Sequence, residues 1–529
     1  MTRPNPHTIA GFAVAALVPW LNMPNWVDSE VFPRWLWVYS VAFLAGLVLL
    51  VRRPITSWSH TMRSRLLVAL AGISVVAMTW FSTAKHYPGL LAGQILDWSA
   101  FALLAYFVAS LPRPNRSHLL NGLAYGAAGA GAAISFWQVF TWAGPGAAFE
   151  LGFFGFQNHW AEFLGFGLVG MFAIRDRSRF ASLLIAPLIF GLALTHCRSV
   201  QLAVLAGAIA LSVTQLRARR PFWVTVSLLV FSLLPFGISK VLRTAESRIS
   251  IATVVAFAHA TPTQPSRGFD LETVKAGNTE LRLNRWVNSL ALVKENPWLG
   301  HGLGGFEFAY RKLGPAADPE TTPQNVVRSP HNAYLELAVE IGIPIALLVL
   351  SLIATMLRSF AVRHFVQTFS PLPLGLLIYW MTDAVFAFPL ELPFPFLTAA
   401  GLLGVFAGEF DHVPHPGVSH RTWGFRRLGS FATIAGLLGL VGAGALFSYQ
   451  ANQALFVPDV AACERFPSVW RSCLRSVDHL AAQGNWDAAW NLALANEKRF
   501  PGVDFFQWQK GALYQSAVMR ALYFGLPVR

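Results

Sequence analysis

Long runs of hydrophobic residues, separated by short polar segments rich in arginine, fill most of this 529-residue chain. A membrane-spanning helix needs about 20 predominantly apolar residues. By this criterion the pattern predicts about thirteen spanning helices, at residues 8–23, 33–51, 66–82, 91–111, 119–141, 159–174, 180–197, 199–215, 222–243, 331–356, 371–389, 394–408 and 428–449. We therefore expect an all-α, polytopic membrane protein.

The spacing of these runs divides the chain into four parts. Residues 1–243 hold nine predicted helices, residues 244–330 form a long loop, residues 331–449 hold four more helices, and residues 450–529 form a polar tail. The tail contains the stretch LAAQGNWDAAWNLALANEKRFPG, which resembles one helix–turn–helix unit of the tetratricopeptide type. Any small helical hairpin fits this stretch equally well.

The arginines in the short connections predict how the chain is oriented. With the N-terminus in the cytoplasm, the cytoplasmic segments hold eighteen arginines, and the short outer segments hold only Arg34, Lys85 and Arg198. Positively charged residues collect in cytoplasmic loops of membrane proteins. We therefore expect a multi-pass protein of the bacterial inner membrane with a cytoplasmic N-terminus. The long loop and the tail are then periplasmic.

Composition supports this interpretation. Hydrophobic residues make up 54% of the chain and charged residues 12%, whereas soluble domains average about 45–50% and about 25%. This composition excludes a disordered chain and disfavours a soluble domain. The net charge of +14 is explained by the cytoplasmic loops, and the sequence contains no nucleic-acid-binding motif. We expect membrane lipids, and no nucleic acid, as partners.

The three cysteines show no metal-ligand spacing, and we expect no metal site. Cys463 and Cys473 both lie in the tail, which the orientation places in an oxidising compartment. We predict a disulfide between them, with two free thiols as the alternative. Cys197 lies in a predicted helix and has no obvious partner.

Four charged residues fall in or at the edge of apolar segments: Asp97, Glu162, Arg198 and Asp383. A charge at the centre of a bilayer costs about 2.5–3.5 kcal/mol on insertion scales. Each is therefore a candidate functional residue. For Asp97 and Asp383, a structural contact between helices is the alternative. Arg198 lies between two predicted helices joined by almost no loop, so we expect it at the outer end of the bundle.

The end of the long loop reads RLNRWVNSLALVKENPWLGHGLGGFEFAY. It predicts an amphipathic helix over residues 281–295 that carries Arg282 and Arg285, followed by a glycine-rich turn that contains His301. Guanidinium groups bind phosphate oxygens in a fork, so arginines on an outer face suit a diphosphate. A solvated surface is the alternative. The turn follows no predicted strand and lacks the Lys-Ser/Thr of a P-loop.

The next stretch reads RSPHNAYLELAVEIGIP and enters the tenth predicted helix. His331 and Asn332 stand at its start, Glu336 lies one turn further, and a glycine and a proline follow within the run. A histidine at a membrane mouth beside arginines can act as a general base. A histidine that caps or packs against the helix is the alternative.

The two motifs together, NPWLGHGLGGF and PHNAYLELAVEIGIP, resemble the signature of the O-antigen ligase/polymerase superfamily. These are bacterial inner-membrane glycosyltransferases of the GT-C type. They comprise O-antigen ligases, protein O-oligosaccharyltransferases, and O-antigen or exopolysaccharide polymerases. The order of many helices, a long periplasmic loop, the histidine and a few further helices is also similar. The resemblance covers roughly residues 150–410.

The resemblance implies roles for individual residues. His331 matches the histidine held to activate the acceptor hydroxyl, and Arg198 and Arg285 match arginines held to bind undecaprenyl diphosphate. Arg282, one turn from Arg285, is a further candidate for that diphosphate. Other candidate contacts to donor or acceptor are Gln157, Asn158, His301, Asn332 and Glu336.

One of these matches departs from the family pattern. Gln157 and Asn158 match a polar stretch that is prominent in the protein O-oligosaccharyltransferases, but here the two residues are adjacent, without the proline common between them in that group. This departure weakens the assignment to protein glycosylation.

The implied reaction needs no metal or cofactor. It moves a glycan from undecaprenyl diphosphate to an acceptor hydroxyl on the periplasmic face and inverts the anomeric carbon. A ligase uses the lipid A core as its acceptor, an O-oligosaccharyltransferase uses a protein, and a polymerase uses a growing glycan. A transporter is an alternative of another class, disfavoured because the two halves show no internal repeat. A structural scaffold also remains open.

Overall fold

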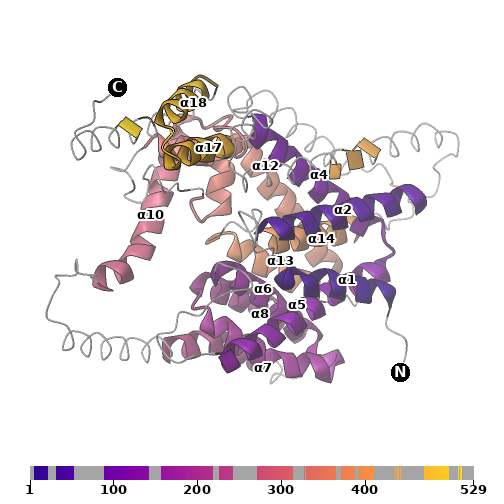
Figure 1. Ribbon diagram of the computed structural model, residues 1–529. Coiled ribbons are helices and arrows are strands. Elements are labelled where there is room, and N and C mark those ends of the chain that lie inside the picture. The colour runs from indigo at the N-terminus through magenta and orange to yellow at the C-terminus, as the bar shows by residue number, and fades with distance from the viewer. Residues whose placement is uncertain are drawn as a thin grey trace, which may run out of the picture.

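The chain folds into a bundle of helices (Figure 1). The computed structural model describes residues 5–21, 31–52, 88–141, 157–217, 225–241, 271–313, 318, 327, 329–364, 371–387, 392–409, 435–436, 438–439, 441–442, 470–499, 510 and 513–514. Every regular element within these ranges is a helix, so the expected all-α class is confirmed for this part of the chain.

Eleven of the thirteen predicted segments coincide with described helices. Segment 66–82 and most of segment 428–449 lie outside the described residues. The bounds are α1 Pro6–Leu17, η1 Val18–Trp20, α2 Val31–Arg52, α4 Pro88–Ser110, α5 Arg113–Thr141, α6 Gln157–Ile174, η3 Arg175–Arg177, α7 Arg179–Leu194, α8 Arg198–Arg217, an unlabelled helix Thr225–Val241, α10 Leu271–Glu295, α11 Phe306–Arg311, α12 Ala333–His364, α13 Leu372–Asp383, α14 Pro393–Glu409, α17 Trp470–Ala482 and α18 Trp486–Arg499.

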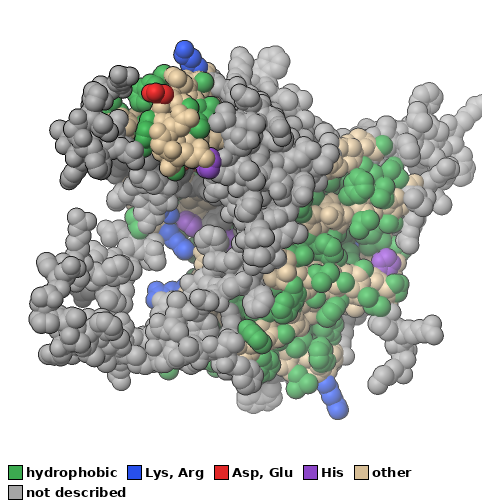
Figure 2. Space-filling model, viewed as in Figure 1, with side chains coloured by type: hydrophobic (Ala, Val, Ile, Leu, Met, Phe, Trp, Pro, Cys, Tyr) green, Lys and Arg blue, Asp and Glu red, His purple; other side chains and the backbone are tan. Residues whose placement is uncertain are grey.

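Two described helices, Arg113–Trp137 and Arg198–Leu216, are long and apolar enough to cross a membrane. Six more are apolar but shorter. Many large hydrophobic side chains are exposed on the bundle, with Leu183 at 72%, and they cover much of the bundle surface seen in Figure 2. Apolar side chains on the outside of an apolar bundle are suited to lipid. The total of about thirteen spans and their orientation stay predictions.

Small residues let the first helix of the bundle approach its neighbour closely. A Cβ at Gly11 on α1 would lie 2.3 Å from the carbonyl oxygen of Leu119, and a Cβ at Gly122 on α5 would lie 2.2 Å from that of Thr8. The two backbones therefore touch, as in small-residue packing of membrane helices. The largest core cluster joins α1, α2, α4–α8, α13 and α14.

The structure places the charges that the sequence locates in apolar segments. Asp97 accepts a hydrogen bond from the Tyr39 hydroxyl and so links α4 to α2, which fits the structural alternative for this residue. Glu162 on α6 and Asp383 at the end of α13 are each 2% exposed and interact electrostatically. Both carboxyl groups also interact with the thiol of Cys197. Helix α6, the end of α13 and the residue before α8 therefore meet at one place in the bundle.

The tail contains the predicted helical hairpin. Helices α17 and α18 are joined by a turn at Gly484, which has a left-handed φ of 79°. Val477, Ala489 and Ala493 form the core of the hairpin. Cys473 on α17 is disulfide-bonded and Cys197 is a free thiol, whereas Cys463 lies outside the described residues, so the predicted pairing stays a prediction.

Candidate active site

Helix α10 carries the two loop arginines and lies against the segment that precedes α12. It begins at Leu271, ten residues earlier than predicted, and ends at Glu295 as predicted. Arg282 and Arg285 are three residues apart and share one face of the helix. On the same helix, Trp286 donates a hydrogen bond from Nε1 to the carbonyl oxygen of Pro330, at 3.1 Å. This bond holds the arginines next to His331.

Arg285 is fixed by partners that the sequence analysis did not identify. Its Nε donates to Oδ2 of Asp318 at 3.0 Å, and the hydroxyl of Tyr310 donates to the same oxygen at 3.0 Å. Asp318 is fully buried and Arg285 is 8% exposed. Mainly because of burial, the pKa of Tyr310 is raised to about 12, which keeps its hydroxyl protonated as a donor. Asp318 is 33 residues from Arg285, and no sequence spacing links the two.

His331 adopts a backbone conformation that its neighbours hold in place. Its φ is 55°, in the left-handed region that is costly for residues other than glycine. Its backbone N–H donates to Oγ of Ser329 at 3.2 Å, and the Ser329 hydroxyl donates to Oε2 of Glu336 at 2.8 Å. Glu336 is thus joined through Ser329 to the backbone of His331. Its predicted contact with a substrate stays a prediction.

Asn332 forms the N-cap of α12. Its Oδ1 accepts hydrogen bonds from the backbone N–H groups of Tyr334 and Leu335, at 3.1 and 3.0 Å. A side-chain oxygen at this position satisfies backbone donors that have no partner within the helix. Asn332, and not His331, therefore caps α12.

The surroundings of the His331 ring favour its neutral form. Burial lowers the pKa of His331, and the charges of Arg282 and Arg285 lower it further, to about 4. The imidazole is therefore neutral near pH 7 and able to accept a proton. On the face shown in Figure 2, histidine and Lys or Arg side chains are exposed close together where α10 meets the bundle.

The glycine-rich turn docks on a break in α12, so the two sequence motifs form one structural unit. The break lies at Gly342, whose φ is 77°, two residues before Pro344. Proline has no N–H, so Glu340 loses the usual partner of its carbonyl within the helix. Gly302 supplies that partner, with its N–H 2.9 Å from the Glu340 oxygen.

Two more backbone hydrogen bonds attach the glycine-rich turn and the residues before it to α12. The N–H of His301 donates to the carbonyl of Val339 at 2.8 Å, and the N–H of Ile343 donates to the carbonyl of Pro297 at 2.8 Å. A broken helix in a membrane protein is stable only where its backbone groups find such partners. The His301 ring lies against the end of α10, with Nε2 3.1 Å from the Leu292 carbonyl oxygen. Its predicted contact with a substrate stays a prediction.

We predict that Gly342→Ala strongly destabilises the protein. A Cβ there would lie 2.5 Å from the carbonyl oxygen of Trp298, and the residue would have to keep its left-handed φ of 77°. We expect a loss of about 1–3 kcal/mol from backbone strain alone, read as a lower melting temperature in detergent.

Gly237→Ala is the matched control, since nothing lies within 4 Å of a Cβ at Gly237 in its helix. It should leave the melting temperature unchanged or raise it slightly. Equal melting temperatures for the two variants would contradict the docking role of Gly342.

The third predicted arginine lies at the same end of the bundle as His331. Arg198 begins α8 and is exposed, and the preceding thiol of Cys197 donates to Oδ1 of Asn158 at 3.4 Å. Cys197 interacts with Asp383, and the next residue, Ala384, accepts a hydrogen bond at 2.9 Å from the N–H of Ala333. These contacts connect the start of α8 to the start of α12.

The residues predicted from the sequence therefore separate into two groups. The arginines on α10 and His331 come together directly, and Arg198 and Asn158 lie at the same end of the bundle through the turn after α13. Gln157 begins α6, but its side chain lies outside the described residues. Within the described ranges, no group of three or more His, Cys, Asp or Glu side chains is arranged to hold a metal. Chemically, this arrangement offers a neutral base beside guanidinium groups that can bind phosphate.

Comparison with known proteins gives one family match. The family model described as O-antigen ligase matches residues 181–350. The match begins on α7 and extends into α12, so it includes Arg198, both arginines of α10, the glycine-rich turn and His331. No curated protein matches the chain.

Proposed function

We propose that this chain transfers a glycan from undecaprenyl diphosphate to an acceptor hydroxyl, because its match to the O-antigen ligase family model at residues 181–350 supports membership of the O-antigen ligase/polymerase superfamily. The lipid A core is the acceptor we favour. The observation that carries the proposal is the meeting of His331 with Arg282 and Arg285, which both act on the electrostatics of its ring. A base and diphosphate-binding groups at one site are what this reaction requires.

The proposed mechanism needs two kinds of protein group. His331 accepts the proton of the acceptor hydroxyl as that oxygen attacks the anomeric carbon. Undecaprenyl diphosphate leaves from the opposite side, so the configuration inverts. Arg282, Arg285 and Arg198 bind the diphosphate and stabilise the charge that develops on it. The mechanism uses no metal ion, and transfer should persist in a chelator.

We predict an unusual pH dependence for this reaction. His331 must be neutral to take a proton, and its pKa of about 4 keeps it neutral well below pH 6. We expect kcat/KM to stay level from about pH 8 to about pH 5 and to fall as pH drops through about 4, because kcat/KM reports the free enzyme. Rates of transfer at saturating acceptor and low donor would measure this profile.

Removing the charge of Arg282 tests why the pKa of His331 is lowered. Arg282→Gln removes one of the two positive charges that lower the pKa of His331, so its fall in kcat/KM should begin at a higher pH. Arg113→Gln, at the start of α5, is the matched control. A fall near pH 6.5 in the wild type, or identical profiles for the two variants, would show that another group controls the rate.

The acceptor distinguishes the three members of the superfamily. Purified protein in lipid would be given an undecaprenyl-diphosphate glycan with lipid A core, with a pilin-type protein, or with more donor alone. We expect product on lipid A core. Product only on the protein would identify an O-oligosaccharyltransferase, and product only from the donor would identify a polymerase. Either result would replace the ligase assignment.

A further inference from the structure

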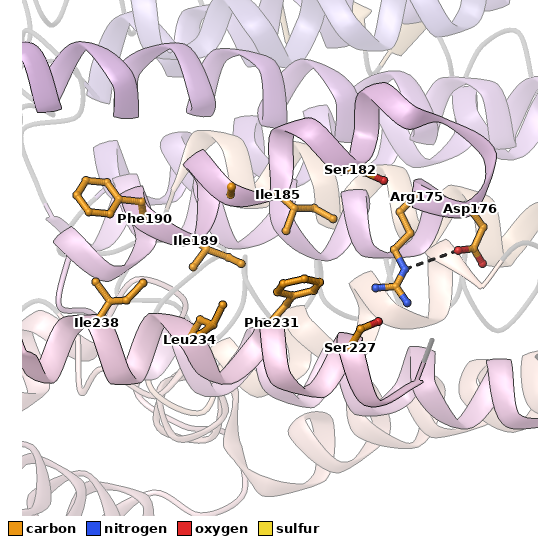
Figure 3. Close-up of a pocket in the computed structure, with 11 residues that line it drawn as sticks. Arg175, Asp176, Ser182, Ile185, Ile189, Phe190, Ser227, Phe231, Leu234 and Ile238 are labelled. Carbon is orange, nitrogen blue, oxygen red and sulfur yellow. Dashed lines mark ion pairs between the residues drawn. The ribbon is translucent and has the colours of Figure 1, made fainter. Parts of the chain in front are cut away.

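A cavity lies between α7 and the helix Thr225–Val241, and none of the candidate active-site residues lines it. It has a volume of about 620 Å³ and is open on one side. Figure 3 shows the side chains that line it, which come from both helices and from the turn η3. Asn158 and Arg175 lie near opposite ends of α6, about 25 Å apart at about 1.5 Å rise per residue. The end of the cavity at Arg175 therefore lies at the end of the bundle opposite the candidate active site.

The lining of this cavity is polar at one end and apolar along its length. Arg175, Asp176, Ser182 and Ser227 gather at one end in Figure 3. The body and far end are lined by Ile185, Ile189, Phe190, Phe231, Leu234 and Ile238. A site with one charged end and an apolar body matches an amphiphile.

The length of the cavity matches one leaflet of a bilayer. Ser227 and Ile238, at its two ends, are separated by about 16 Å along their helix at about 1.5 Å per residue. The hydrocarbon core of a membrane is about 30 Å thick, so one leaflet contributes roughly half of that. A single fatty acyl chain of one leaflet would therefore fill the cavity.

The charge at the polar end favours an anionic headgroup. The connection from α6 to α7 reads Arg175-Asp176-Arg177-Ser178-Arg179, with three arginines and one aspartate. The side chain of Arg175 is only 10% exposed, and its Nε lies 3.7 Å from Oδ1 of Asp176, at the long end of an ion pair. A guanidinium group at the mouth of a cavity between two apolar helices is the kind of group that binds lipid phosphate.

We propose that this cavity binds an anionic glycerophospholipid, with one acyl chain between α7 and the helix Thr225–Val241 and its phosphate at Arg175. The lipid belongs to the leaflet opposite the candidate active site. Its binding would fix the helix Thr225–Val241 against α7 without taking part in glycan transfer. The proposal does not depend on the reaction proposed above.

Two variants test separately the binding of the lipid headgroup and the binding of its acyl chain. Arg175→Gln removes the charge at the polar end, and Ala186→Trp places a large side chain in the apolar body, which Ala186 lines. Each has a matched control on α7, outside the lining. Arg179→Gln makes the same charge change at an exposed position, and Leu183→Trp adds the same side chain at a position that is 72% exposed.

The full chain would be reconstituted in nanodiscs with equal amounts of phosphatidylglycerol and phosphatidylcholine, and then released into mild detergent. Native mass spectrometry would count the lipids that stay bound. We expect the wild type to retain phosphatidylglycerol over phosphatidylcholine. Arg175→Gln should lower this ratio about fivefold, the effect of roughly one basic residue at a membrane surface. Ala186→Trp should lower the retention of both lipids.

Several outcomes would overturn the proposal. Equal retention of the two lipids by the wild type would remove the anionic preference. Equal effects of Arg175→Gln and Arg179→Gln would assign that preference to surface charge instead of the cavity. Retention of an undecaprenyl lipid at this site, or a second copy of the chain displaced by Ala186→Trp, would identify another occupant. Melting temperatures of the variants would show that each remains folded.

Discussion

His331→Ala should reduce the rate of glycan transfer by a factor of about 10² to 10⁴ and leave donor binding nearly unchanged. Proton transfer by a positioned side chain contributes that range of rate enhancement. Arg282 and Arg285 remain in place in this variant, so the diphosphate keeps the groups proposed to bind it. Single-turnover transfer and equilibrium binding of the lipid-linked glycan would measure the two effects separately.

The matched control for this variant is His301→Ala. His301 belongs to the same pair of motifs, but its ring is bonded to the end of α10, 3.1 Å from the Leu292 carbonyl oxygen. We expect it to lower stability more than the transfer rate measured on folded protein. Equal losses of transfer in the two variants, or full transfer by His331→Ala, would remove His331 from the mechanism.

Replacing Arg285 should produce the second large effect, on both stability and donor binding. Arg285→Gln leaves the fully buried Asp318 carboxylate without the guanidinium that lies 3.0 Å away. Removing one partner of a buried ion pair typically costs about 3–5 kcal/mol. We expect a much lower melting temperature and a raised KM for the donor.

A double variant separates these two roles. Asp318→Asn together with Arg285→Gln removes both buried charges and keeps groups that can hydrogen-bond, so most of the lost stability should return. Transfer should stay low, because the diphosphate has lost a guanidinium. If transfer returned together with stability, the Arg285–Asp318 pair would be structural only.

Much of the helical fold could be predicted because apolar runs of membrane length carry a strong signal. The segments from α4 to α8 and from α12 to α14 agree with the predicted ranges to within a few residues at most ends. The larger differences arise at helix ends. Helix α12 continues to His364, beyond the predicted residue 356, and α13 ends at Asp383, before the predicted residue 389. Hydropathy shows neither how far a helix continues into a polar connection, as in α12, nor where it ends inside an apolar run, as in α13.

The site could be predicted in its residue types but not in its contacts. The spacing of Arg282 and Arg285 placed both on one helical face, and His331 followed at the start of a span. The hydrogen bond from the N–H of Gly302 to the carbonyl of Glu340 joins two backbone groups, so the pattern of side chains does not predict it. The partnership of Arg285 with Asp318 crosses a loop whose path the sequence does not reveal.

The buried acidic pair was predicted only as separate charges. Glu162 and Asp383 lie on helices far apart in the sequence, and only their packing shows that the two carboxyl groups meet near Cys197. Asp97 accepts a hydrogen bond from the hydroxyl of Tyr39, which fits a structural contact between helices. Individual intramembrane charges can thus be found from sequence, whereas their partners require the fold.

The most direct test of glycan transfer follows the donor in proteoliposomes that contain the purified protein, lipid A core and a chelator. We expect each glycan lost from undecaprenyl diphosphate to appear on the acceptor, with one free undecaprenyl diphosphate released. Intact donor that is bound but never cleaved with any acceptor, or that crosses the bilayer unchanged, would contradict glycan transfer and favour a transporter.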